Sequence, residues 1–211
     1  MTPRRFLPVL LLATAACAPL LPTPAPVATQ HEHALQPAAL PAARPPAAGA
    51  PVLALAEVRA GPLLDGRRML YRDRTGRLAA FAENRWTAPP EAQLAPWLVA
   101  ALERAGGVAA VVAPGGHGVA TLLLDAELLA LQLDSEPAPG TVQLELRLQL
   151  VAARSRAVVA TTRLRETEAL AAPGPDALAV AAGHALTRLL DAGATFVRQA
   201  VAALPPPGER P

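Results

Sequence analysis

The clearest pattern in the chain is a strict alternation of apolar and polar residues from Thr141 to Val151. The apolar positions are Val142, Leu144, Leu146, Leu148 and Leu150. The polar positions between them are Thr141, Gln143, Glu145, Arg147 and Gln149. Because successive side chains of a β-strand point to opposite faces, this alternation predicts a strand with one buried face and one wet face.

Similar but less regular patterns predict further strands, separated by turns that contain Gly, Pro and Asp. The expected strands cover residues 52–59, 67–72, 78–87, 108–112, 119–133, 141–151 and 157–165. The long run carries charges at Asp125 and Glu127, and we expect a β-bulge to change its facing midway. The short turns between strands favour antiparallel pairing.

Two segments have apolar residues at helical spacing. The first follows Pro89-Pro90, has Glu91 in its first turn and ends at Gly106-Gly107. The second begins around Asp176 and ends at the prolines that start at position 205. The predicted fold is therefore α+β, an antiparallel-rich β-sheet with two amphipathic helices packed on one face.

The N-terminus predicts export and lipid anchoring. Residues 1–16 combine two arginines, a short apolar run and small residues, and Cys17 follows them. This order is typical of a bacterial lipoprotein signal peptide, which is cut before a cysteine that becomes lipidated. Thr14 stands where leucine is usual, and an ordinary secretory signal with an incidental cysteine is the alternative. Cys17 is the only cysteine, so it has no disulfide or metal-site companion.

Residues 17–51 form a tract rich in Pro and Ala, for which we expect a disordered linker with a reach of about 100 Å. His31 and His33 lie inside it without a third ligand, so we expect solvated linker rather than a metal site. The folded domain is then expected at 52–204, with a disordered tail at 205–211.

Composition and charge argue against a nucleic-acid-binding protein. All 19 basic residues are arginines, and loss of the signal peptide with Arg4 and Arg5 leaves 17 arginines against 17 acidic residues. Aromatic residues make up only 3% of the chain, so base-stacking platforms are not expected.

The sequence contains no convincing catalytic, cofactor or metal site. The glycine-rich loop at 115–118 lacks the Lys-Ser or Lys-Thr ending of a phosphate loop. The candidate acid/base groups for a hydrolase are Asp125, Glu127, Asp134 and Glu136, which lie around a predicted strand and turn. His184 is flanked by Gly and Ala on the second helix, where a surface or packed histidine is expected.

Trp86 and Trp97 have two interpretations. Both are expected to pack the junction between the sheet and the first helix. The alternative is that one of them lines an apolar groove for a partner or a lipid.

The order of features over residues 52–204 resembles the ABC-type transport auxiliary lipoprotein family. The matching residues are Tyr71-Arg72, Phe81, Arg85-Trp86, Pro89-Pro90, Leu94, Leu98, Leu102 and Gly106. The long Pro/Ala tract and Thr14 depart from the family pattern.

The resemblance implies a non-enzymatic lipoprotein of the Gram-negative outer membrane that faces the periplasm. Such proteins work with an MCE-domain protein and an ABC permease and ATPase that move lipids or other hydrophobic molecules. The domain is expected to dock the end of the MCE assembly or to form a homo-oligomeric ring. The alternatives are an envelope-structure or assembly lipoprotein with no transport role, and an enzyme.

Overall fold

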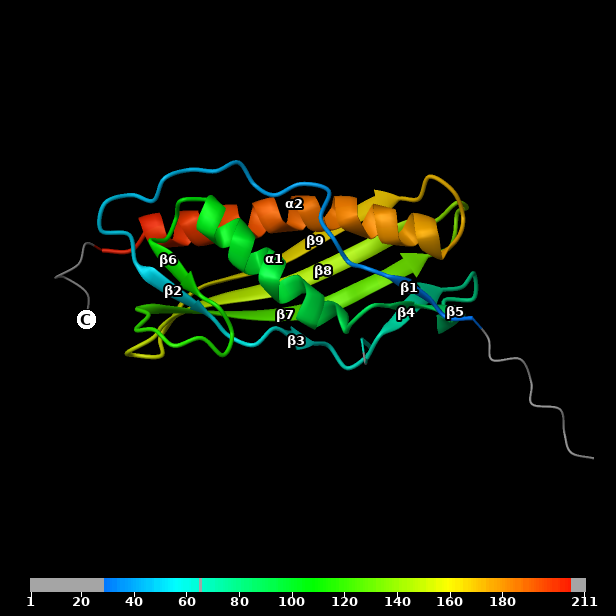
Figure 1. The fold of residues 1–211 in the computed structure, drawn as a ribbon, viewed down its shortest axis with the longest axis horizontal. Helices are drawn as coiled ribbons and strands as arrows, with labels where there is room; N and C mark the ends of the chain where they lie inside the picture. Colours follow the sequence, from blue (N-terminus) through cyan, green and yellow to red (C-terminus); the bar gives the residue numbers. More distant parts are fainter. Residues whose placement is uncertain (1–28, 65, 206–211) are drawn as a thin grey trace, which may run out of the picture.

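The fold, a computed structural model, describes residues 29–64 and 66–205 (Figure 1). Its strands are β1 (His31–His33), β2 (Val52–Leu55), β3 (Arg59–Ala60), β4 (Arg68–Arg72), β5 (Leu78–Trp86), β6 (Ala110–Val112), β7 (Leu122–Asp134), β8 (Thr141–Ala152) and β9 (Val158–Ala169). The helices are α1 (Pro90–Arg104) and α2 (Pro175–Ala202). Both helices lie over one face of a single large sheet, which confirms the predicted α+β class.

The central strand of the sheet is β7, which is paired along both of its edges. On one edge it pairs antiparallel with β8, from Leu122 opposite Ala152 to Asp134 opposite Thr141. On the other edge it pairs in parallel with the short strands β2, β3 and β4, which follow one another along its length. The remaining strands extend the sheet from these neighbours.

A bulge in the middle of β7 keeps apolar side chains facing the helices, as the sequence predicts. The register with β8 shifts between Leu128 and Ala130. Before the shift the even-numbered residues are buried, and after it Leu131 and Leu133 are buried instead. One extra residue turns every later side chain to the opposite face of the strand. The bulge therefore keeps the apolar residues on the buried face, although they change from even to odd positions along β7.

The two helices cover the apolar face of the sheet, and α1 also packs against α2. Helix α1 begins at Pro90 and continues without interruption through Pro96. Helix α2 packs on β8 and β9, and Gly193 lets its backbone approach Leu148 and Leu164. The buried residues of α2 are Leu178, Ala181, Ala182, Gly183, Ala185, Leu186, Leu189, Leu190, Gly193, Ala194 and Val197.

The face of the sheet away from the helices carries charged side chains. Glu145 is only 4% exposed there, because Arg163 and Arg165 of β9 close over its carboxylate. The Arg165 guanidinium donates to Glu145 Oε2 at 3.0 Å, and Arg163 donates to Oε1. A buried carboxylate needs such partners, since an unpaired charge in that position is costly.

Two predictions of chain organisation need correction, and the expected antiparallel-rich sheet is present with parallel pairs added to it. The expected first strand, 52–59, is two strands, β2 and β3, because the chain leaves the edge of β7 between them. The sheet is mixed: β7–β8 and β8–β9 are long antiparallel pairs, whereas the short strands pair with β7 in parallel. The prediction of a disordered linker is wrong for residues 29–51, which lie against the domain. The predicted signal peptide, Cys17 and residues 206–211 lie outside the described residues.

Leu124 tests the role of β7 in the core. Its side chain is fully buried, whereas Leu63 is 65% exposed. Leu124→Ala is expected to lower the free energy of unfolding by about 2–5 kcal/mol, because it leaves a cavity under the helices. The matched change Leu63→Ala is expected to cost less than about 0.5 kcal/mol. Chemical denaturation measures both, and equal losses would contradict this account of the core.

Candidate functional site: the helical face and its N-terminal strap

Residues 34–45 follow β1 and cross the outer side of the two helices, which we call the helical face (Figure 1). We call this segment the strap. The strap first contacts α1. Leu35 is 1% exposed, and its backbone N–H donates to Gln93 Oε1 at 2.8 Å. The indole N–H of Trp97 donates to the Leu35 carbonyl at 3.1 Å. These contacts give the strap one buried apolar side chain and a fixed backbone position.

The strap then contacts α2. The Thr187 hydroxyl accepts a hydrogen bond from the Ala38 N–H at 2.9 Å and donates to the Gly183 carbonyl at 3.0 Å. Gly183 lies directly under the strap, and a Cβ atom there would come within 2.4 Å of the Gln36 carbonyl oxygen. Only glycine therefore permits this approach of strap and helix.

The last part of the strap is fixed to the end of α1. The Arg104 side chain donates from Nε to the Pro41 carbonyl at 2.9 Å. The Arg44 N–H donates to the Arg104 carbonyl at 2.8 Å, which satisfies an acceptor in the last turn of the helix. Gly106 has φ of 73°, and a Cβ atom there would lie 2.7 Å from the Pro45 carbonyl oxygen.

Strand β1 fixes the start of the strap, so His31-Glu32-His33 is not solvated linker. β1 pairs in parallel with β5, with His31 opposite Asn84 and His33 opposite Trp86. Glu32 accepts from Arg85 Nη2 at 2.7 Å. His33 Nε2 lies 2.9 Å from Asn84 Oδ1. The expectation failed because the partners of β1 lie about fifty residues away, where no local pattern reveals them.

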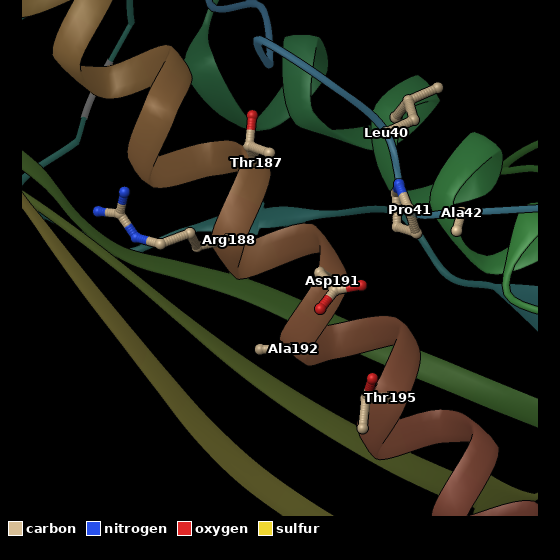
Figure 2. A pocket seen from close by; sticks show the side chains of 8 residues that line it. All are labelled: Leu40, Pro41, Ala42, Thr187, Arg188, Asp191, Ala192 and Thr195. Atoms are coloured by element: carbon tan, nitrogen blue, oxygen red, sulfur yellow. The ribbon is translucent and has the colours of Figure 1, made fainter.

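A cavity of about 490 Å³ lies between the strap and α2 (Figure 2). Its lining residues are Leu40, Pro41, Ala42, Thr187, Arg188, Asp191, Ala192 and Thr195. Arg188 donates from Nε to Glu166 Oε2 at 2.8 Å, and this bond raises the pKa of its guanidinium above the ordinary value. A second carboxylate, Glu168, lies 2.9 Å from Arg188 Nη1. The charge of Arg188 at this cavity is therefore already balanced by two carboxylates of β9.

The two tryptophans have different environments. Trp86 is 1% exposed and belongs to the core, so its indole offers no surface to a partner. Trp97 is half-buried and faces the strap through its hydrogen bond to Leu35. Trp97 therefore packs against the strap, and the groove interpretation stays a prediction.

The structure brings together two of the four candidate acids. Asp125 and Glu127 line one small hollow on the open face of β7, where Glu127 pairs with Arg147 at 3.6 Å. Asp134 lies farther along the sheet and pairs with Arg72 at 3.4 Å. His184 is half exposed, with Nδ1 3.4 Å from Glu168 Oε1. Within residues 29–64 and 66–205, no group of three or more His, Cys, Asp or Glu side chains is placed to hold a metal ion.

A second cavity, of about 570 Å³, lies at the end of the sheet where the β6–β7 loop, the β8–β9 turn and the end of α2 meet. We call this the far end, because the chain leaves toward residue 28 at the opposite end, beside β5 and the start of α2 (Figure 1). Sequence reasoning missed both the strap and this cavity. Leu35 and Leu40, the large apolar residues within the strap, and Gly183 inside a helix were the available signals.

Comparison with known families gives one match. The family model described as ABC-type transport auxiliary lipoprotein component matches residues 33–194. This span includes the whole strap, all strands from β2 to β9 and most of α2. Comparison with curated proteins finds no match.

Several solved structures share the fold. Protein XCC0632 from Xanthomonas campestris superposes with a TM-score of 0.68 at 20% identity, covering 81% of this chain and 95% of that one. An uncharacterised protein gives 0.58 at 14% identity, with 81% and 97% covered. Protein CT253 from Chlamydia trachomatis gives 0.51 at 12% identity, with 74% and 100% covered. Neither helix in the described part of the chain has the length and apolarity needed to span a bilayer.

Gly183→Ala tests whether the strap can dock on α2 only when no side chain stands at position 183. The added methyl group collides with the Gln36 carbonyl, so the strap is expected to detach and the Ala38 amide to exchange its hydrogen at least about tenfold faster. Gly193→Ala is the matched control on the same helix, because its Cβ meets only leucine side-chain ends. Hydrogen exchange with mass spectrometry measures both, and unchanged strap protection in Gly183→Ala would contradict the prediction.

Proposed function

Since the chain belongs to the family of ABC-type transport auxiliary lipoprotein components, we propose that it is the lipid-anchored, non-catalytic auxiliary component of an MCE/ABC-type system. Such a system moves lipids or other hydrophobic solutes between membranes. The family match over residues 33–194 carries this proposal, because it covers most of the helical face, the whole strap and nearly all of the sheet together.

In this proposal Cys17 is the anchor, and the domain lies on the periplasmic side of the outer membrane. Cys17 follows a short apolar run and small residues, as a lipidated cysteine does in a lipoprotein signal. The docked strap changes the expected reach of this anchor. Between Cys17 and Thr29 the chain spans at most about 40 Å, against about 100 Å for a free linker that ends at residue 51. The domain is therefore tethered close to the membrane.

The partners in this proposal are an MCE-domain protein and its ABC permease and ATPase. ATP hydrolysis belongs to the ATPase, since the loop at 115–118 has no lysine for a nucleotide phosphate. Copies of the chain are proposed to assemble around the end of the MCE protein. The outer edge of β9, which has no strand partner among the described residues, is one surface available for such contacts.

Cys17→Ser tests the anchor. Serine has no thiol for the lipid, so the protein is expected to move from the membrane fraction to the soluble fraction of lysed cells. Thr14→Leu is the matched control, because it supplies the usual leucine of the signal and is expected to leave the protein on membranes. Fractionation followed by immunoblotting measures both. Membrane retention of Cys17→Ser would rule out lipidation at this residue.

Co-purification tests the transport role. Crosslinking of intact cells followed by purification of the wild-type protein is expected to recover an MCE-domain protein and an ABC permease. Cys17→Ser is expected to reduce this recovery, because the domain loses its position at the membrane. Absence of both partners from the wild-type sample would favour an envelope-structure lipoprotein without a transport role.

A further inference from the structure

The cavity at the far end is walled by apolar side chains from three separate segments. Val119 and Leu122 come from the β6–β7 loop and the start of β7, and Leu204 comes from the end of α2. Ala157 and Val159 come from the β8–β9 turn and the start of β9. Val119 is 92% exposed, so an apolar side chain stands in water at the mouth of this cavity. An exposed valine that adjoins an apolar cavity enlarges the apolar surface there.

The rim of this cavity is cationic. Arg154 and Ser155 line it, and Arg156 follows in the same turn. The β6–β7 loop at 113–121 and the turn at 152–158 contain no acidic residue. Among the described residues, no ion pair involves Arg154 or Arg156, whereas most arginines of the open sheet face are paired with carboxylates.

We propose that the far end binds one acyl chain of an anionic lipid, with the chain in the cavity and the headgroup phosphate at Arg154. This inference rests on the proposed function and names the ligand of one surface. A cavity of about 570 Å³ with apolar walls and few polar groups suits a small amphipathic molecule. A guanidinium at its mouth suits a phosphate, which it binds by charge-assisted hydrogen bonds.

The strap does not line this cavity. The strap ends before reaching the cavity and contacts the helices instead.

The far end and β1 lie at opposite ends of α2. Strand β1 lies beside the start of this helix, where His33 contacts Asp176, and the cavity lies at its other end (Figure 1). The helix has 28 residues, which corresponds to about 42 Å.

Photocrosslinking of the full-length protein in vesicles tests this proposal. The probe is phosphatidylglycerol with a diazirine at the end of one acyl chain, and mass spectrometry maps the crosslinked residues. Wild-type protein is expected to carry crosslinks within 119–122 and 152–159. Val119→Glu, which puts a carboxylate at the mouth, and Ala157→Trp, which fills the cavity from an exposed position, are expected to reduce them at least about fivefold. Val180→Glu, at a valine 62% exposed near the start of α2, is the matched control and is expected to change them less than about twofold.

Arg154→Ala separates the headgroup contact from the apolar contact. It is expected to reduce crosslinking by the phosphatidylglycerol probe about fivefold and to leave crosslinking by an uncharged diacylglycerol probe unchanged. Arg74→Ala, which removes an exposed arginine of the β4–β5 hairpin, is the matched control and is expected to change neither.

Wild-type protein without crosslinks at the far end would overturn the proposal, and so would equal crosslinking in Val119→Glu, Ala157→Trp and wild type. Crosslinks from the far end to a second copy or to a transporter protein, with no lipid adduct, would likewise overturn it. Co-purification of the transporter proteins does not depend on the cavity. Their recovery with a failed lipid test would thus remove this inference and leave the proposed function standing.

Discussion

The pairing of β7 on both edges is the constraint on which the rest of the structure depends. Its edge toward β8 is continuous, and its other edge is shared by β2, β3 and β4 in turn. Those three strands have only two to five residues each, and β7 is the neighbour that all of them share. Because they are paired to one long strand, the chain between them is brought back to the sheet three times, and α1 is thereby placed beside α2.

The sequence reveals the parts of this fold that are encoded locally. Alternation in residues 141–151 and helical spacing after Pro90 depend on neighbours a few positions apart, so both elements were predicted correctly. The parallel pairs were not predicted. Leu53 pairs with Leu122, for example, and the residues next to either of them form no pattern that indicates this pairing. The bulge after Leu128 was predictable, since the apolar phase of β7 changes within one strand.

The strap over the helical face was less accessible to sequence reasoning. The prolines and alanines of the strap have the composition of a linker, yet their carbonyl and amide groups find partners on α1 and α2. Composition predicts whether a segment buries much of its own apolar surface, but not whether a groove elsewhere accepts its backbone. The family match adds that the strap belongs to the domain, since it begins at residue 33. An anchored protein of this family with a docked strap has less freedom above the membrane than a long linker would give.

The docking of β1 also has a mechanical consequence. β1 runs parallel to β5, and the chain ahead of His31 continues along the same line, since Gln30 still bonds to the Ala82 carbonyl. Tension along that line loads the hydrogen bonds between β1 and β5 in shear, so they share the load instead of opening one after another. The strap then bears force only after the hydrogen bonds between β1 and β5 have broken. A domain pulled between its anchor and a large partner complex would keep its helical face intact under loads that would unzip a hairpin joined at the same point.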